Sequence, residues 1–222
     1  MTTQLALDTP RIDHADALTW LADQPPECAR AVIYDPPYAV GSPVRGRDDG
    51  AAGSVAGPFG FLHRTLELSS HTLTPGGIVV IFADWRRMPD LAYIASMVGL
   101  RAATQVAWVR SRPGTGGLMR SAWDPILVAA RGTADAIDRA AIPNVVHADY
   151  PSRRRHPYEK PSTVYQHILA RVVRPGDLVL DPFAGSGSSA VAATAVGGVW
   201  RGCDIDPAYA SAGLEAASRP AT

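Results

Sequence analysis

The segment 177–195, DLVLDPFAGSGSSAVAATA, constrains the fold more than any other part of this 222-residue chain. A short apolar run ends at Asp181, glycines follow at Gly185 and Gly187, and an alanine-rich stretch begins at once. Glycines at such a crossover let the backbone approach a ligand closely, and the first turn of a helix offers N–H groups without partners. The segment predicts a strand, a turn that is either ligand-binding or merely tight, and a helix.

Apolar strand patterns and helical patterns alternate along the rest of the chain, which is long enough for one well-packed domain. This alternation predicts an α/β fold with a doubly wound, mostly parallel sheet and no internal repeats. The expected strands lie near 10–13, 29–35, 78–84, 101–109, 124–130, 177–181 and 198–206, and the expected helices near 16–24, 59–73, 87–98, 161–173, 187–196 and 207–217.

Two segments show no regular pattern. Residues 39–58 are rich in glycine, serine and charge, which predicts a long mobile loop of the kind that forms lids or binding loops. Residues 131–160 are polar and are expected to connect two halves of the domain.

Composition limits the class of protein. The formal net charge is zero, whereas many nucleic-acid-binding proteins are strongly basic. Arginines are nevertheless dense at 45–47, 86–87, 110–120 and 153–155, where they either follow phosphates or form a solvated surface.

The cysteines and the apolar runs indicate the compartment. Cys28 and Cys203 show neither paired spacing nor a metal-ligand pattern, so we expect reduced thiols and no metal site. The first ten residues lack a secretory signal, and no apolar run is long enough to cross a bilayer. We therefore expect a cytoplasmic protein with no membrane partner.

An acidic residue follows the glycine loop at the end of the next expected strand. Asp204 lies about 20 residues beyond the loop, where nucleotide-binding sheets place a carboxylate on ribose hydroxyls. The loop lacks the third glycine of the dinucleotide fingerprint and the Gly-Lys-Ser/Thr of a phosphate loop. A cofactor with an adenosine but without a terminal phosphate group to hold fits this pattern best.

The stretch Asp35-Pro36-Pro37-Tyr38 follows a second apolar run. At the carboxyl end of a strand it is either a plain proline turn or a site with two acceptors, the Asp35 carboxylate and the Pro36 carbonyl, beside a flat Tyr38 ring. Two such acceptors suit a planar ring that carries an exocyclic amino group, since they turn the nitrogen lone pair towards an electrophile.

The pair DPPY and DPFAGSGS resembles the S-adenosylmethionine-dependent methyltransferases that modify adenine N6 or cytosine N4 in DNA. DPPY precedes the glycine loop here, an order similar to that of the circularly permuted β class. Three further segments match the family: HADAL at 14–18, HPYEKPSTVY at 156–165 and GCDIDPAY at 202–209. The resemblance implies a single methyltransferase domain with a catalytic half at 1–130, a shortened recognition or linker region at 131–155 and a cofactor-binding half at 156–222.

The resemblance also implies roles for individual residues. A flipped base would be bound and stacked by Asp35, Pro36, Pro37 and Tyr38. Asp35 would also stabilise the positive charge that develops on the nitrogen. Lys160, the single lysine of the chain, falls on the lysine that helps to hold the methionine part of the cofactor. The implied S-adenosylmethionine-binding residues are Asp16, Ala17, Lys160, Pro161, Ser162, Asp181, Phe183, Ala184, Gly185, Ser186, Gly187, Asp204 and Ile205.

The chain departs from the family in two places. The interval 131–155 is too short for an independent recognition domain, and Trp123-Asp124-Pro125 stands where a His-Glu pair is common. Contacts to double-stranded DNA must then come from 39–58, 110–120 or 153–155, or from a second copy of the chain or a recognition subunit. A very short or relaxed recognition site is the natural hypothesis.

Three alternatives stay open at this point. Aspartate in DPPY favours adenine N6, whereas cytosine N4 would need the same chemistry on another base. Related Pro-Pro-Tyr arrangements serve enzymes that methylate RNA bases or protein glutamine, generally in the unpermuted order. A non-catalytic subunit that binds cofactor and DNA is the alternative from another class.

Overall fold

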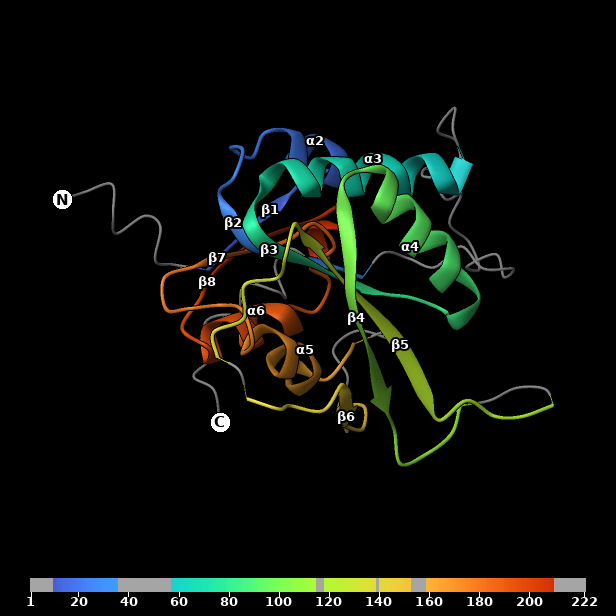
Figure 1. The fold of residues 1–222 in the computed structure, drawn as a ribbon. Coiled ribbons are helices and arrows are strands. Elements are labelled where there is room, and N and C mark those ends of the chain that lie inside the picture. Colours follow the sequence, from blue (N-terminus) through green and yellow to red (C-terminus); the bar gives the residue numbers. More distant parts are fainter. Residues whose placement is uncertain (1–9, 36–56, 115–117, 139, 153–158, 210–222) are drawn as a thin grey trace.

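The computed structural model describes residues 10–35, 57–114, 118–138, 140–152 and 159–209 (Figure 1). Its elements in chain order are β1 (Arg11–His14), α2 (Ala17–Ala22), β2 (Ala29–Tyr34), α3 (Gly57–Thr72), β3 (Leu73–Phe82), the 3-10 turn η1 (Trp85–Arg87), α4 (Met88–Met97), β4 (Leu100–Val109), β5 (Trp123–Arg131), β6 (Val145–His147), α5 (Ser162–Leu169), β7 (Leu178–Asp181), α6 (Ser188–Ala195) and β8 (Val199–Asp204).

The strands form one sheet in the order β1-β8-β7-β2-β3-β5-β4-β6. Neighbouring strands run parallel except where β5 pairs with β3 and with β4, which are antiparallel contacts. The first strand of the chain therefore pairs with the last described strand, and β2 lies between β7 and β3 in the centre. The predicted α/β fold with a mostly parallel sheet is confirmed.

Helices cover both faces of the sheet, as Figure 1 shows, with α2, α3 and α4 on one side and α5 and α6 on the other. Residues of β2 alternate between the two layers: Ala31 and Ile33 pack towards α5 and α6, whereas Val32 and Tyr34 pack towards α2, α3 and α4. Every residue of β2 is buried, because a central parallel strand is covered on both sides. This explains why residues 31–34 read as a continuous apolar run, while Arg30 uses its guanidinium to bind backbone carbonyl oxygens.

The strand expected at 78–84 begins earlier than the sequence indicated. β3 starts at Leu73, which pairs with Ala29, and the register then shifts so that Ile78 pairs with Ala31. The intervening Pro-Gly-Gly segment, with Gly76 at φ +77°, forms this irregularity inside the strand and is not a separate turn before it.

Three other expectations need correction or fall outside the described residues. The polar segment 131–160 contains a strand, β6, which pairs with β4 and was not expected. Helix α5 ends at Leu169, four residues before the expected end. Of the loop expected at 39–58, residues 39–56 lie outside the described residues, and 57–58 already belong to α3.

The C-terminal helix expected at 207–217 is seen as helical residues at 207–209, and the remainder lies outside the described residues. Across the described parts of the chain, no helix is long and apolar enough to cross a membrane.

The contact between β7 and β8 yields a prediction about packing. Gly202 pairs with Asp181, and a Cβ at this position would lie 2.5 Å from the ring of buried Trp200 and 2.9 Å from the Asp181 carbonyl oxygen. We expect Gly202→Ala to lower the free energy of unfolding by about 1–3 kcal/mol, measured by urea denaturation, because the ring and the backbone must move apart.

Gly114→Ala is the matched control, since the Ser121 carbonyl oxygen, at 3.5 Å, is the one described atom that a Cβ there would meet. Its free energy of unfolding should change by less than about 0.5 kcal/mol. Equal stability of the Gly202 and Gly114 variants would contradict the close approach at β8.

Candidate functional site

The acidic residues singled out by the sequence gather at one edge of the sheet. Asp35 directly follows β2, Asp181 ends β7 and Asp204 ends β8, and these three strands are parallel neighbours. Parallel strands present their carboxyl ends at the same edge, which is where open α/β sheets bind ligands. Pairing of Val32 with Leu180 thus brings Asp35 and the glycine loop together although they are far apart in the chain.

The glycine loop turns the chain from β7 into α6. Gly185 and Gly187 have φ values of +48° and +76°, a region that side chains rarely adopt, and Gly187 is the N-terminal cap of α6. The Gly185 N–H donates to Asp204 Oδ2 at 2.8 Å, and the Ala184 N–H donates to the Cys203 carbonyl oxygen at 3.0 Å. Both bonds fix the loop on the end of β8.

Asp181 supports the loop from inside. Its carboxyl is buried, accepting from the Phe183 N–H at 2.9 Å on Oδ1 and from the Ser189 hydroxyl on Oδ2. Burial raises the pKa of Asp181 to about 7, an effect that the bonds from Ser189 and Phe183 partly oppose. Asp181 therefore joins the start of the loop to the first turn of α6.

Asp16 and Asp204 form a second corner of the edge. The Asp16 side chain caps α2 by accepting from the backbone N–H groups of Leu18 and Thr19, both at 3.1 Å. The Ala15 N–H donates to the Asp204 carbonyl oxygen at 3.1 Å, so the end of β1 lies directly beside the end of β8. These contacts bring two predicted cofactor residues to the glycine loop.

The residues next to Asp16 and Asp204 differ in exposure. Ala17 is buried in the first turn of α2, whereas Ile205 is 67% exposed although its side chain is apolar. Asp204 also accepts the Asp206 N–H on Oδ1 at 2.9 Å, so both of its oxygens already bind backbone amides. Ile205 is thus an apolar surface available beside an ordered acid.

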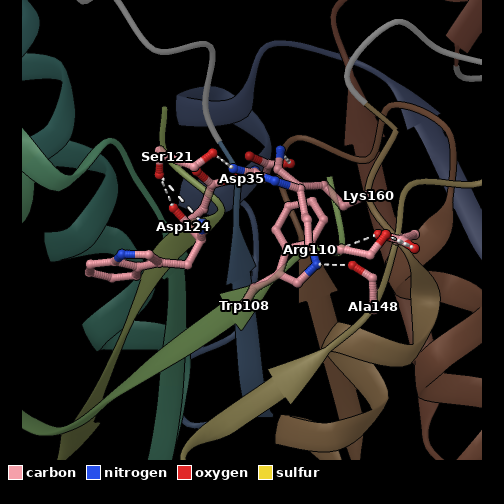
Figure 2. Close-up of polar contacts among 10 residues, drawn as sticks. Asp35, Trp108, Arg110, Ser121, Asp124, Ala148 and Lys160 are labelled. Carbon is pink, nitrogen blue, oxygen red and sulfur yellow. Dashed lines mark hydrogen bonds and ion pairs between the residues drawn. The ribbon is translucent and has the colours of Figure 1, made fainter. Parts of the chain in front are cut away.

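Asp35 is held by residues from the other end of the chain. The Lys160 ammonium donates to Asp35 Oδ2, and both side chains are largely buried, at 11% and 16% exposure (Figure 2). Burial raises the pKa of the Tyr165 hydroxyl of α5 well above its ordinary value, and the nearby Asp35 acts in the same direction. Phe82, the last residue of β3, lies beneath this group, with its ring 5.4 Å from the Lys160 nitrogen and 4.8 Å from the Tyr165 ring.

Tyr165 and Phe82 were not among the predicted site residues. Tyr165 stands inside the segment 156–165 that had been singled out, so its position was visible in the sequence, but its partner was not. Pro161 caps α5 and Ser162 begins it, directly after Lys160. The predicted residues Pro36, Pro37 and Tyr38 lie outside the described residues.

A second polar cluster forms where β4 ends and β5 begins (Figure 2). The buried Arg110 guanidinium pairs with Asp124, donates to the Ser121 carbonyl oxygen at 3.1 Å, and lies over the rings of Trp108 and Tyr150 at 5.5 and 5.7 Å. Arg110 is therefore an internal residue and not part of a phosphate-binding surface. The same pair explains the aspartate of the Trp-Asp-Pro segment, which the sequence left without a role.

One open hollow lies away from the acidic edge. It has a volume of about 640 Å³ and an apolar lining between α4 and the strands β4 and β5, with Trp85 and Trp123 partly exposed at its margin. It offers neither a carboxylate nor a glycine loop, and the acids and the loop that the sequence singled out lie at the other edge, formed by β2, β7 and β8. In the parts of the chain that are described, no three His, Cys, Asp or Glu residues are grouped to hold a metal ion.

Comparison with known proteins relates these features to one family. The sequence model of the N6/N4 methyltransferase family, which is described as DNA methylase, matches residues 123–215. The DNA adenine methyltransferase YhdJ of Escherichia coli strain K12 is 24% identical over 250 residues, which cover 96% of this chain and 84% of YhdJ.

Solved structures of methyltransferases have the same fold. The complex of M1.HpyAVI with S-adenosylmethionine gives a TM-score of 0.75 at 21% identity and covers 95% of this chain and 100% of that one. The cytosine-N4-specific PvuII DNA methyltransferase gives a TM-score of 0.70 at 17% identity and covers 92% and 85%. The predicted sheet type is confirmed, and the circular permutation stays a prediction.

The buried carboxyl of Asp181 makes stability depend on pH. Its folded pKa of about 7 lies above the ordinary value of 3.8, so the folded state binds the proton more tightly than the unfolded state. This contribution is fully present below about pH 4 and is lost as pH rises through about 7. Relative to Asp181→Asn, the wild-type protein should lose about 4 kcal/mol of unfolding free energy over that range.

The measurement is urea denaturation of both proteins, without added ligand, at intervals between pH 4 and pH 8. Asparagine keeps an acceptor for the Phe183 N–H but does not titrate. A constant difference in unfolding free energy between the two proteins across this range would show that Asp181 ionises with its ordinary pKa.

Proposed function

The chain is a relative of the S-adenosylmethionine-dependent DNA amino-methyltransferases, and from this premise we propose that it methylates the exocyclic amino group of a base in DNA. The observation that carries the proposal is the pairing of β2 with β7, since it sets Asp35 beside the glycine loop at one sheet edge. An acceptor for an amine and a loop suited to an adenosine cofactor are then neighbours. Methyl transfer between two bound molecules needs this juxtaposition.

The residues at the loop fit S-adenosylmethionine. Among the described residues, the Phe183 carbonyl oxygen, at 3.8 Å, would be the nearest neighbour of a Cβ built on Gly185, so these residues leave space directly beside the backbone. Exposed Ile205 offers an apolar contact for an adenine ring, and Asp204 lies where ribose hydroxyls are bound in such sheets. When bound, the cofactor supplies an electrophilic methyl group. The residues proposed to hold it are Asp16, Ala17, Pro161, Ser162, Asp181, Phe183, Ala184, Gly185, Ser186, Gly187, Asp204 and Ile205. The resemblance adds Lys160 to this set, but its ammonium lies on Asp35.

The chain itself would supply the binding and orientation of the amine. In this proposal the Asp35 carboxylate accepts one N–H of the target amine, the Pro36 carbonyl accepts the other, and Pro37 keeps the turn rigid. Tyr38 stacks on the base, which must leave the duplex to reach the site. Asp35 also stabilises the positive charge that develops on the nitrogen.

We propose adenine N6 as the target, because the first residue of the motif is aspartate. YhdJ, related over most of this chain, is named a DNA adenine methyltransferase. Cytosine N4 is the second candidate, because a structural neighbour is the cytosine-N4-specific PvuII enzyme. Both targets use the same two acceptors, so the methylated nucleoside decides between them.

The proposed organisation is one domain, with a catalytic half at 1–130, a short linker or recognition region at 131–155 and a cofactor half at 156–222. Double-stranded DNA is the proposed partner in the cytoplasm. A second copy of the chain or a recognition subunit would supply DNA contacts that the short central region lacks. We expect the protein to recognise a short DNA sequence of few bases. A long, strictly required sequence motif, found by methylome sequencing after treatment with the isolated protein, would contradict this expectation.

We expect purified protein, incubated with S-adenosylmethionine and unmethylated genomic DNA, to produce N6-methyladenine on nucleoside mass spectrometry. Asp35→Ala should reduce the rate at least about 100-fold, because the amine loses the acceptor that orients it and that stabilises its developing charge. Cofactor binding, measured by calorimetry, should change little.

N4-methylcytosine as the product would correct the base and keep the mechanism. Turnover by Asp35→Ala equal to that of the wild-type protein would contradict the role of the carboxylate. Cofactor binding without any methyl transfer would favour a non-catalytic subunit, which can be tested by adding a partner protein.

A further inference from the structure

We propose that Lys160 and Tyr165 are positioning residues that hold the Asp35 carboxylate in the orientation needed to accept the target amine. The inference deepens the proposed function and rests on it. The family resemblance implies that this lysine contacts the cofactor, whereas the structure places its ammonium on Asp35 Oδ2. The inference concerns how the amine acceptor is fixed.

The surroundings leave the carboxylate little freedom. Lys160 precedes α5 directly, and its ammonium reaches across to the end of β2. Tyr165 lies in the first turn of α5, and Asp35 is among the charges that act on its hydroxyl. The Phe82 ring contacts the Tyr165 ring and lies under the Lys160 ammonium, so the two donors are themselves packed in place. A carboxylate that pairs with an anchored ammonium, beside a packed hydroxyl, is restricted to few rotamers.

The other charged groups near Tyr165 favour its role as a donor. Burial is the main cause that raises the pKa of the Tyr165 hydroxyl well above its ordinary value, and the charges of Asp35, Asp181 and Glu159 act in the same direction. The hydroxyl therefore keeps its proton at neutral pH. It is available to donate to Asp35 whenever the carboxylate is charged.

The use of lysine at this position is also informative. The chain has 21 lysine and arginine residues in total, and Lys160 is the single lysine. An ammonium is a compact charge that fits between a carboxylate and a ring, whereas a guanidinium is a wide planar fork. The position therefore selects the smaller cation in a chain that otherwise uses arginine.

Kinetics distinguish positioning from cofactor binding. Tyr165→Phe removes one hydroxyl and keeps the ring on Phe82, and we expect kcat to fall about tenfold, the effect of one hydrogen bond, with KM for DNA and Kd for S-adenosylmethionine within about twofold. Lys160→Met should lower kcat about 100-fold with the same unchanged constants. Tyr93→Phe, at a residue that is 67% exposed on α4, is the matched control and should leave kcat unchanged.

A raised Kd for S-adenosylmethionine with an unchanged kcat would overturn the inference, since Lys160 would then serve the cofactor. Unchanged constants in both variants would overturn it as well. If Lys160→Met fails to fold because Asp35 is left without its cation, Tyr165→Phe still decides the outcome.

A spectroscopic test does not depend on methyl transfer. Labelling only lysine with ¹³C and ¹⁵N gives one set of side-chain signals, because the chain has a single lysine. We expect Asp35→Asn and Tyr165→Phe to shift these signals, and Asp138→Asn, which alters an exposed aspartate paired with Arg171, to leave them in place. Signals that do not respond to Asp35→Asn would show that the ion pair is absent in solution.

The two tests separate the inference from the proposed function. If the wild-type protein transfers no methyl group to DNA, the proposed function fails and the lysine spectrum still decides whether Asp35 is held. If the wild-type protein is active and the lysine signals ignore Asp35, the function stands and the positioning role is overturned.

Discussion

Parallel pairing of β2 with β7 is the contact on which the rest of the site depends. The register places Ala31 opposite Val179 and Val32 opposite Leu180, so both strands end at the same edge. Because both strands are buried on their two faces, a slip by one residue would reverse their side chains between the two cores. Tight burial of the sheet centre therefore fixes the distance between the amine acceptor and the glycine loop.

Collecting three acids at one edge is electrostatically unfavourable, and the chain offsets this cost differently at each one. Asp35 binds an ammonium, and Asp204 binds two backbone amides. Asp181 has no ion-pair partner among the described residues, and its burial raises its pKa. The first two arrangements keep a charged oxygen ordered near the edge. The third places a carboxyl that can stay protonated in the interior, where its bonds to the loop and to α6 are structural.

Features that depend on neighbouring residues were predictable from the sequence, and features that depend on distant partners were not. The cap at Asp16, the buried run of β2 and the left-handed turns at Gly185 and Gly187 follow from local chemistry. The contact of Lys160 with Asp35 spans 125 positions, and β6 exists only because β4 offers it an edge. Such long-range contacts depend on the tertiary fold as a whole, and the two residues in contact do not by themselves reveal them.

The pairing of β2 with β7 and the hold on Asp35 act in the same part of the molecule. α5, which carries Tyr165, packs in one core with α6, which begins at the glycine loop. In the proposed reaction, the α5–α6 layer therefore supports both the acceptor of the amine and the loop that binds the methyl donor. If that layer shifts, the acceptor and the loop move together and the distance between them is kept. If each were supported by a different layer, small shifts of the two layers would change that distance. In-line transfer over a short distance depends on that separation, because the reacting atoms must approach to about 3–3.5 Å before the bond can form.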